Sequence, residues 1–330
     1  MTAEVNVATA DASAIVGRSE WALVWERLRR KRLAMISLVV IAIIYGAGLL
    51  ASVPSSIPFV GRGLAPYSYT EQNLDRALEG SSRDHWLGTD RLGRDLLSRA
   101  MYSARTTLIV TVAVMLSGSL IIGNTLGLLA GYRGGWVDSA IMRIGDVFSS
   151  LPGLPMLILI NAAFAPRVTD AVRNLEDNTA LSGLVASGFA SYLIVFVALS
   201  LFFWVGTARV IRAQVLQLRE REFIMAAESL GASQRRIIFR HVLPSVAFLI
   251  ILQISTGLGG VAGSEILLSW FGVGVQPPAA SFGAMLFDGS GARTFQAHPN
   301  LLLVPGVIVT MLLFSFALLG DALNDAMRSR

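Results

Sequence analysis

The sequence predicts an all-α integral membrane protein with six transmembrane helices and both termini in the cytoplasm. Hydrophobic residues make up 54% of the 330 residues and charged residues only 15%, and the mean hydropathy is +0.61. Soluble domains do not have this composition. The apolar residues form runs long enough to cross a hydrocarbon core of roughly 30 Å. Basic residues lie mainly in the short segments between alternate runs, as expected of cytoplasmic loops.

The first element is a polar segment, 1–32, which we predict to be a cytoplasmic interfacial helix. Trp21 and Trp25 suit the membrane interface, and the basic run from Arg29 to Arg32 holds this end inside the cell. A 21-residue apolar run, 33–53, follows as the first span. A cleaved signal peptide is the alternative, but both the lead and the apolar core are too long for one.

The remaining spans are expected at 106–130, 151–165 (preceded by an amphipathic turn from 139), 184–207, 245–268 and 301–320. The extracytoplasmic segment is then 54–105, and a five-helix core occupies 106–325, with a short tail at 326–330. Within the core, 208–244 is a basic cytoplasmic loop, and 165–182 is an outer loop without a motif. With an even number of spans, all the short basic segments fall on one side.

Small residues form a stripe along the second span. Ser119, Gly123, Gly127 and Gly131 are four apart, so they share one helical face. Gly259 and Gly263 have the same separation in the fifth span. Because small residues let helix backbones approach closely in lipid, we predict that these faces pack on other helices.

The basic loop is predicted to contain two short helices. Apolar residues recur at helical spacing up to Ala227, Gly231 supplies a stop, and Ser233 can cap a second helix that ends at Pro244. A solvated connection that merely joins two spans is the alternative interpretation of such a loop.

The segment MAAESLGASQRRIIFRHVLP, 225–244, resembles the coupling-loop signature of ABC-importer permeases, in the form seen in dipeptide and oligopeptide permeases. The resemblance implies a type I importer core whose loop docks into a groove on an ATPase subunit. Met225 stands where the family has an acid, which leaves open whether Glu222 or Glu228 replaces it. The coupling-loop candidates are Glu222, Ala226, Ala227, Gly231, Ala232, His241, Leu243 and Pro244.

A second motif, HWLGTDRLGRDLLSR at 85–99, precedes the second span. It reads as a turn, with Thr89 or Asp90 able to cap a helix that begins near Leu92. It is similar to an element at the same place in dipeptide and oligopeptide permeases. The positions carried over from that resemblance are Gly88, Thr89, Asp90, Gly93, Arg94 and Asp95.

Glu265 is the only acid inside a clear span. A carboxylate there must face a cavity, a partner or a neighbour's donor, so either a pathway role near the outer gate or a helix-packing hydrogen bond is expected. The loop after this span, GVGVQPPAASFGAML, is similar to the family's outer loop, with Ala280 and Phe282 in place of the usual proline and tryptophan. We take Glu265, Gln276, Pro277 and Pro278 as the pathway or gate candidates.

Motifs of catalysis are missing from the sequence. It has no phosphate-binding GxxxxGK[ST] loop, no HExxH and no GxSxG, and its three histidines lack ligand spacing. Zero cysteines exclude disulfides and thiolate metal sites. The net charge of +5 fits membrane orientation, and no basic patch of the nucleic-acid type occurs. We therefore expect no catalytic, cofactor or metal site on this chain.

The resemblance implies a permease subunit of an ATP-driven peptide importer in the bacterial cytoplasmic membrane. Its expected partners are a second homologous permease, two ATP-binding domains (separate or fused) that hold ATP and Mg, an extracytoplasmic peptide-binding protein and membrane lipid, with no nucleic acid. A related solute such as nickel or haem is an alternative cargo. An intramembrane hydrolase would need a nucleophile and base at span depth, and a channel would not need the helix-glycine-helix loop.

Overall fold

The fold is all-α in the part of the chain that the computed structural model describes, residues 20–51, 63–179, 183–185 and 187–328. Within these ranges the extended structure is a single bridge between Thr89 and Asp95. Five helices are long and apolar enough to cross a membrane, and a bent helix pair makes up to six. The predicted fold class is confirmed in helix content and in number of spans.

The N-terminal helix α2 (Glu20–Arg30) leads into the first span, α3 (Arg32–Leu50). Leu28 is buried with Ala34 and with Ala322 of the last helix, α14 (Asn300–Arg328), and Lys31 Nζ lies 2.8 Å from the Asp325 carboxylate. The predicted segment 1–32 is described only from residue 20. Residues 52–53 of the predicted first span and 329–330 of the tail also lie outside the described residues.

The second span is one continuous rod made of α4 (Leu96–Val114), the π-helix η2 (Met115–Gly123) and α5 (Asn124–Arg133). It begins before the predicted 106 because Asp95 caps it: its carboxylate accepts a 2.7 Å hydrogen bond from the Ser98 amide. We had expected the cap at Thr89 or Asp90 and a start near Leu92, which is wrong. The side chain of Asp90 instead bonds to the amides of its own turn.

The small-residue stripe packs against α8 (Phe189–Arg219), as predicted. A Cβ added at Gly127 would lie 2.8 Å from the Ala208 carbonyl oxygen, and one at Gly123 would lie 2.8 Å from the Thr207 Cβ. Ser119 shares a 2.7 Å hydrogen bond with the Thr207 hydroxyl. Gly259 packs in the same way on Phe316 of α14. Both predicted small-residue faces therefore pack within the chain.

We expect Gly127→Ala to destabilise the chain by about 1 to 3 kcal/mol, because the new methyl group would press on backbone that cannot move aside. Gly206→Ala is the matched control, since a Cβ at this exposed glycine of α8 meets nothing within 4 Å. Thermal unfolding of the purified variants in detergent measures the difference. Equal melting temperatures for the two variants would contradict close α5–α8 packing.

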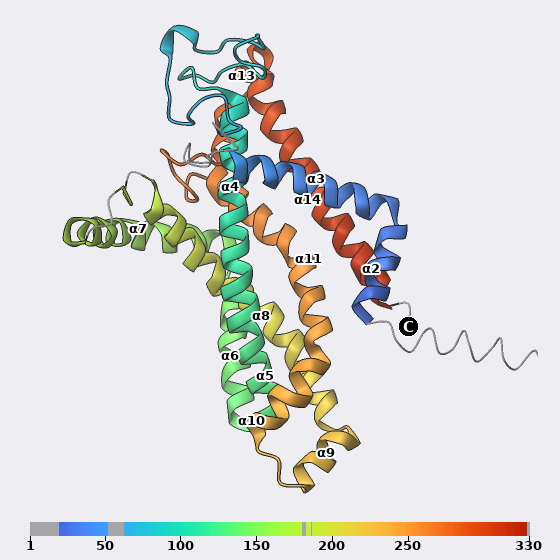
Figure 1. The fold of residues 1–330 in the computed structure, drawn as a ribbon. Coiled ribbons are helices and arrows are strands. Elements are labelled where there is room, and N and C mark those ends of the chain that lie inside the picture. The colour runs from blue at the N-terminus through green and yellow to red at the C-terminus, as the bar shows by residue number, and fades with distance from the viewer. Residues whose placement is uncertain (1–19, 52–62, 180–182, 186, 329–330) are drawn as a thin grey trace, which may run out of the picture.

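The third predicted span is broken. Helix α6 (Gly135–Ser150) and helix α7 (Gly153–Asn178) meet at an angle of 92°, and Figure 1 shows α7 projecting sideways from the other helices. The residues predicted as an outer loop, 165–182, are helical as far as Asn178, and 180–182 lie outside the described part. The apolar spacing of Val168, Val172 and Leu175 was the helical signal that we missed.

Helix α8 continues to Arg219, past the predicted end of its span, and is followed by α9 (Glu222–Ser229) and α10 (Gln234–Ile237). From α10 the chain runs without a break through the π-helix η3 (Ile238–Val242) into α11 (Leu243–Trp270). We had expected Pro244 to end the second short helix, which is wrong. The proline follows a π-helical turn, a kind of irregularity at which helices accommodate proline without ending.

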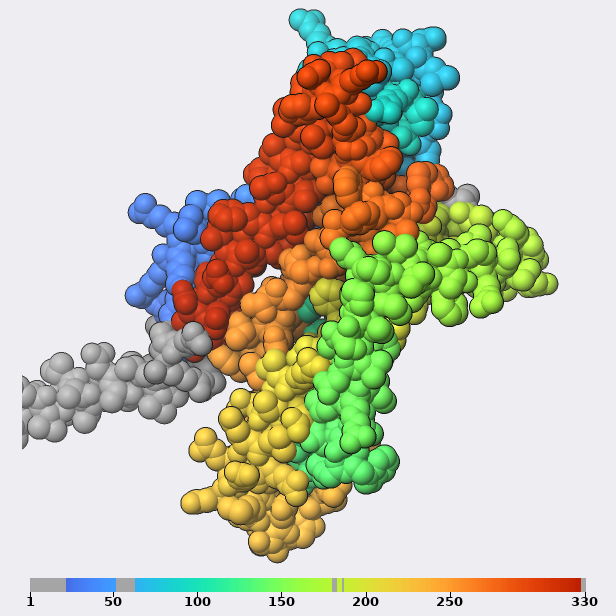
Figure 2. Space-filling model, turned by 180° about the vertical axis from the view of Figure 1, so that it is seen from behind, coloured from blue at the N-terminus to red at the C-terminus, as the bar shows by residue number. Residues whose placement is uncertain are grey.

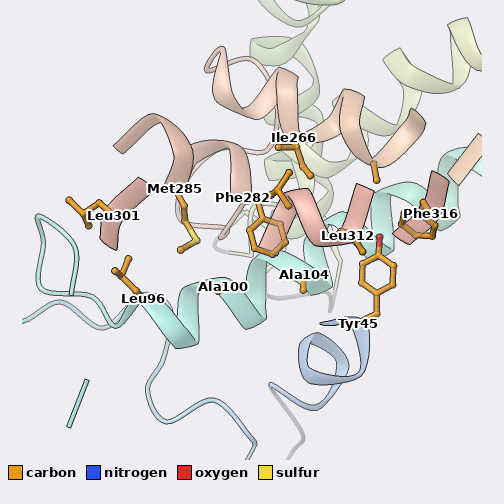
Figure 3. Packing of buried hydrophobic residues seen from close by; sticks show 12 residues of the cluster. Tyr45, Leu96, Ala100, Ala104, Ile266, Phe282, Met285, Leu301, Leu312 and Phe316 are labelled. Atoms are coloured by element: carbon orange, nitrogen blue, oxygen red, sulfur yellow. The ribbon is translucent and has the colours of Figure 1, made fainter. Parts of the chain in front are cut away.

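At the other end of the molecule, α12 (Phe282–Gly289) and α13 (Ala292–Ala297) lie between α11 and α14. Figure 3 shows the core here, formed by side chains of α3, α4, α11, α12 and α14 around Phe282, which is fully buried. The phenylalanine that replaces the family's tryptophan is therefore a packing residue. Figures 1 and 2 place this end opposite to α9 and α10.

Candidate functional site

The coupling loop was predicted at 208–244, and its part beyond α8, residues 222–244, is called the coupling segment here. Buried apolar side chains attach this segment to the ends of α5 and α8. Ile224 of α9, Ile237 of α10 and Val242 of η3 are each at most 1% exposed. They form one cluster with Leu128 and Tyr132 of α5 and Ile211 and Val215 of α8. A change in the angle between these helices must therefore move the segment with them.

The opposite side of the coupling segment is exposed and apolar. Leu230 is 89% exposed, and Phe223 and Met225 are about half exposed. Ala226 and Gly231 are also exposed. Exposed apolar patches of this kind are typical of protein or membrane interaction sites. Leu230 was not among the predicted coupling residues, although it directly precedes Gly231 in the sequence.

Gly231 forms the turn between α9 and α10. Its φ of +78° is in the left-handed region, and its amide donates a 2.9 Å hydrogen bond to the Glu228 carbonyl. The Ala232 amide donates to the Ala227 carbonyl at 3.0 Å. This pair of bonds closes α9 in the manner of a glycine C-cap. Ser233 then caps α10 as predicted, accepting a 3.4 Å bond from the Arg236 amide.

The other predicted coupling residues divide between the two sides of the segment. Ala227, Ala232 and Leu243 are half-buried against the apolar cluster, and Pro244 is exposed at the start of α11. The half-buried His241 ring lies 6.5 Å from the Phe223 ring. The structure thus brings all eight predicted residues into one helix-turn-helix, but not all onto one face.

Glu222 and Glu228, the two candidates for the acid that the family has at the position of Met225, have different surroundings. The Glu228 carboxylate accepts a 2.9 Å hydrogen bond from the Tyr132 hydroxyl of α5, so it is engaged inside the chain. Glu222 is exposed in the first turn of α9. A negative charge at that position is favourable for the helix dipole and is also available to a partner.

The outer motif forms a buried ion cluster. Asp90, whose side chain is 1% exposed, accepts hydrogen bonds from the Leu92 and Arg94 amides at 2.8 and 3.0 Å. It also accepts from the guanidinium groups of Arg94, at 2.7 Å, and Arg99. These bonds hold the turn as one rigid unit at the start of α4.

Two further acids complete this cluster. Asp95 accepts from the Ser98 hydroxyl at 2.7 Å and lies 3.0 Å from His85 Nδ1. Asp288 of α12 accepts a 3.1 Å bond from Arg99, so the cluster joins α4 to the segment after α11. We did not predict Asp288, although it is a lone acid in an otherwise apolar run.

The remaining positions of the outer motif shape its backbone. Gly88 and Gly93 have φ of +86° and +69°, and a Cβ at Gly93 would overlap the Asn73 carbonyl. The Thr89 hydroxyl accepts a 2.9 Å bond from the Glu79 amide and donates to the Arg76 carbonyl. All six predicted motif residues therefore take part in one compact turn.

Glu265 is fully buried between α11 and α4. Its carboxylate accepts hydrogen bonds from the Thr107 hydroxyl at 2.7 Å and the Ser269 hydroxyl at 2.9 Å. Ser269 in turn accepts a 3.0 Å bond from the Val275 amide. Glu265 is thus linked, through Ser269, to the loop that carries the other gate candidates.

Gln276 and Pro277 line a cavity of about 230 Å³ together with Trp270, Phe287 and Asp288. Glu265 is not among the residues that line this cavity, and neither is Pro278, which is exposed. The structure therefore places Gln276 and Pro277 on the wall of this cavity, whereas Glu265 is separated from it by Ser269, which also lines it. No group of three metal-ligating side chains occurs in the described ranges.

We expect Glu265→Leu to lower the yield of folded protein, because it removes two hydrogen bonds. One joins α11 to Thr107 of α4 and the other lies within α11, to Ser269. Such bonds are worth about 0.6 to 2 kcal/mol each in membranes. Glu265→Gln is the matched control, since the amide has the same shape and keeps an acceptor. The readout is the monodisperse fraction after detergent extraction. Equal yields for both variants would contradict a packing role, and lost transport by a well-folded Gln variant would instead support a pathway role.

Comparison with known proteins gave two family matches. The model of the binding-protein-dependent transport system inner membrane component matches residues 123–330. The model of the N-terminal transmembrane domain of oligopeptide transport permease C matches residues 19–80. The two matches together cover the coupling segment, most of the spans and the N-terminal helices.

Curated relatives match over nearly the whole chain. The dipeptide transport system permease protein DppC of Alkalihalophilus pseudofirmus is 34% identical over 94% of this chain and 90% of its own length. The oligopeptide transport system permease protein OppC of Bacillus subtilis is 31% identical over 98% of this chain and 94% of its own length. The glutathione transport system permease protein GsiD of Pectobacterium atrosepticum is 33% identical over 94% of this chain and 91% of its own length. An inward-facing structure of the methionine ABC transporter MetNI covers 67% of this chain and 96% of its own, at 17% identity and a TM-score of 0.43.

Proposed function

The chain belongs to the family of binding-protein-dependent transport system inner membrane components, and from that premise we propose that it is a permease subunit of an ATP-driven peptide importer. It is a multi-pass membrane protein whose family supplies the transport subunit rather than the ATPase. The single observation that carries the proposal is the coupling segment, which has a buried face on α5 and α8 and an exposed apolar face.

The proposed mechanism is mechanical coupling. Closure of two ATP-bound ATPase domains can change the permease only through a contact that differs between its states. The exposed face around Leu230 and Gly231 is the contact that we propose. Because the buried face is packed on α5 and α8, a displacement of the segment tilts those helices and opens the path alternately to each side. Glu222 supplies the acid that Met225 lacks.

The proposed partners are a second homologous permease, two ATP-binding domains that hold ATP and Mg, and an extracytoplasmic peptide-binding protein. The cargo assignment rests on relatives whose names specify dipeptides, oligopeptides and glutathione. We propose a short peptide, and nickel or haem is the alternative that a binding assay of the cognate binding protein would reveal.

Affinity purification of the tagged chain from its native membrane, followed by reconstitution, tests the proposal. We expect a second permease and ATPase subunits to co-purify, and the vesicles to accumulate labelled peptide only with ATP and the loaded binding protein. A homo-oligomer of this chain that conducts ions without ATP would support the channel alternative and overturn the proposal. Peptide cleavage by the isolated chain would support the hydrolase alternative.

We propose the topology expected from the sequence, with both termini and the coupling segment in the cytoplasm, and it predicts which surfaces are accessible to reagents. A cysteine at Ser233, in the coupling segment, should react with an impermeant maleimide only from the cytoplasm, and one at Ser81 only from outside. The chain has no native cysteine to interfere, and both serines are exposed. Labelling of intact cells against inverted vesicles gives the result. Reaction at position 233 in intact cells would show that the orientation is the reverse of the proposed one.

A further inference from the structure

A groove of about 600 Å³ lies between α5 and the start of α11, on a side of the coupling segment to which no role has been assigned above. Most of its walls are apolar side chains from both π-helices and their neighbours, and Asn124 and Thr125 of α5 are polar residues among them. Ile121 of η2 and Phe239 of η3 are each 61% exposed along it, and Leu128, Leu129 and Leu243 complete the walls. A groove with mostly apolar walls along a predicted span suits a hydrocarbon chain better than water.

The chemistry changes at one end of the groove. Arg133, in the last turn of α5, and Arg235, in α10, line it together with Gln234. Both arginines are exposed. Two guanidinium groups at the mouth of an apolar groove are complementary to one molecule with a negative head and a hydrocarbon body.

The length of the groove matches one leaflet of a membrane. From Leu120 to Arg133 the rod rises about 20 Å at about 1.5 Å per residue. Half of the hydrocarbon core is about 15 Å thick. A molecule with its head at Arg133 therefore reaches about as far as the midplane at Leu120, as a phospholipid tail does.

We propose that this groove is a binding site for an anionic phospholipid, with the phosphate held by Arg133 and Arg235 and an acyl chain along Ile121 and Phe239. The leaflet is cytoplasmic if the proposed topology holds, but the chemistry of the site does not depend on it. Since α10 belongs to the coupling segment, the bound lipid braces that segment against α5.

Photocrosslinking in the assembled transporter tests the site. A photoreactive phenylalanine analogue is placed at Ile121, or at Ile36 of α3 as a control with 58% exposure. The complex is reconstituted in nanodiscs with equal amounts of phosphatidylcholine and phosphatidylglycerol. We expect the ratio of phosphatidylglycerol to phosphatidylcholine adducts at Ile121 to exceed the ratio at Ile36 by on the order of tenfold.

Charge variants then identify the head-group contacts. The combined Arg133→Gln and Arg235→Gln variant should lower the Ile121 ratio to that of Ile36, whereas Arg236→Gln, next to the groove but not lining it, should leave the ratio unchanged. Equal ratios at both positions, a ratio unaffected by the double variant, or adducts only with protein or peptide would overturn the proposal. The readout needs neither transport nor hydrolysis, so the lipid site can fail this test while the proposed function holds.

Discussion

Replacing Gly231 by aspartate is expected to abolish peptide-stimulated ATP hydrolysis while leaving the permease folded. A Cβ at this position meets nothing within 4 Å inside the chain, so the substitution does not disturb the core. It does place a charged side chain on the exposed apolar turn beside Leu230. Truncation or obstruction at the centre of an interface costs about 2 kcal/mol or more, on the order of thirtyfold in affinity.

The control series separates docking from backbone strain. Gly231→Ala adds a small side chain at φ +78° and costs about 1 kcal/mol of turn stability, so a partial loss is expected. Gln217→Asp adds the same charge on the exposed face of α8, outside the turn, and should be neutral. The measurements are ATPase subunit retained per permease and hydrolysis stimulated by loaded binding protein. Wild-type values for Gly231→Asp would make the segment a passive connection.

Replacing Asp90 by alanine is expected to destabilise the outer cluster by about 3 to 5 kcal/mol. The substitution leaves Arg99, whose side chain is only 5% exposed, with the partly exposed Asp288 as its acid partner, and breaking a buried ion pair by removing one partner has a cost of that size. It also removes the acceptor for two backbone amides. We expect hydrogen exchange in residues 76–99 to accelerate by about two to three orders of magnitude.

The exposed ion pair of the same outer segment is the matched control. Asp84 lies 2.9 Å from Arg76, with side chains 60% and 42% exposed, and such pairs contribute about 0 to 1 kcal/mol. Asp84→Ala should therefore leave exchange within about fivefold of the wild type. If both variants exchange alike, the cluster around Asp90 does not stabilise the turn.

Local sequence signals predicted most of the fold correctly. Hydropathy identified the spans because each backbone in lipid must satisfy its hydrogen bonds within a helix. The four-residue spacing from Ser119 to Gly131 indicated a packing face, and Gly231 and Ser233 indicated a helix end and a helix start. In each case the physical cause acts within a few residues.

The errors arose where distant contacts decide the outcome. The bend between α6 and α7 lies at Pro152, whereas the helix through Pro166 and the continuous helix through Pro244 go against the usual effect of proline. Asp288 joined the outer cluster across 189 positions, a pairing that one sequence does not reveal. Likewise, the burial of Glu265 behind Ser269 depends on how α4 meets α11.

The central claim is that the coupling segment transmits ATPase movement to the spans, and a site-specific cross-link tests it most directly. A photoreactive residue at the exposed Ala226, in the assembled and transporting complex, should cross-link to an ATPase subunit, and stimulated hydrolysis should fall with the cross-linked fraction. The same probe at Ser81, at the opposite end, should not. A fully active complex in which position 226 never reaches the ATPase would contradict the account.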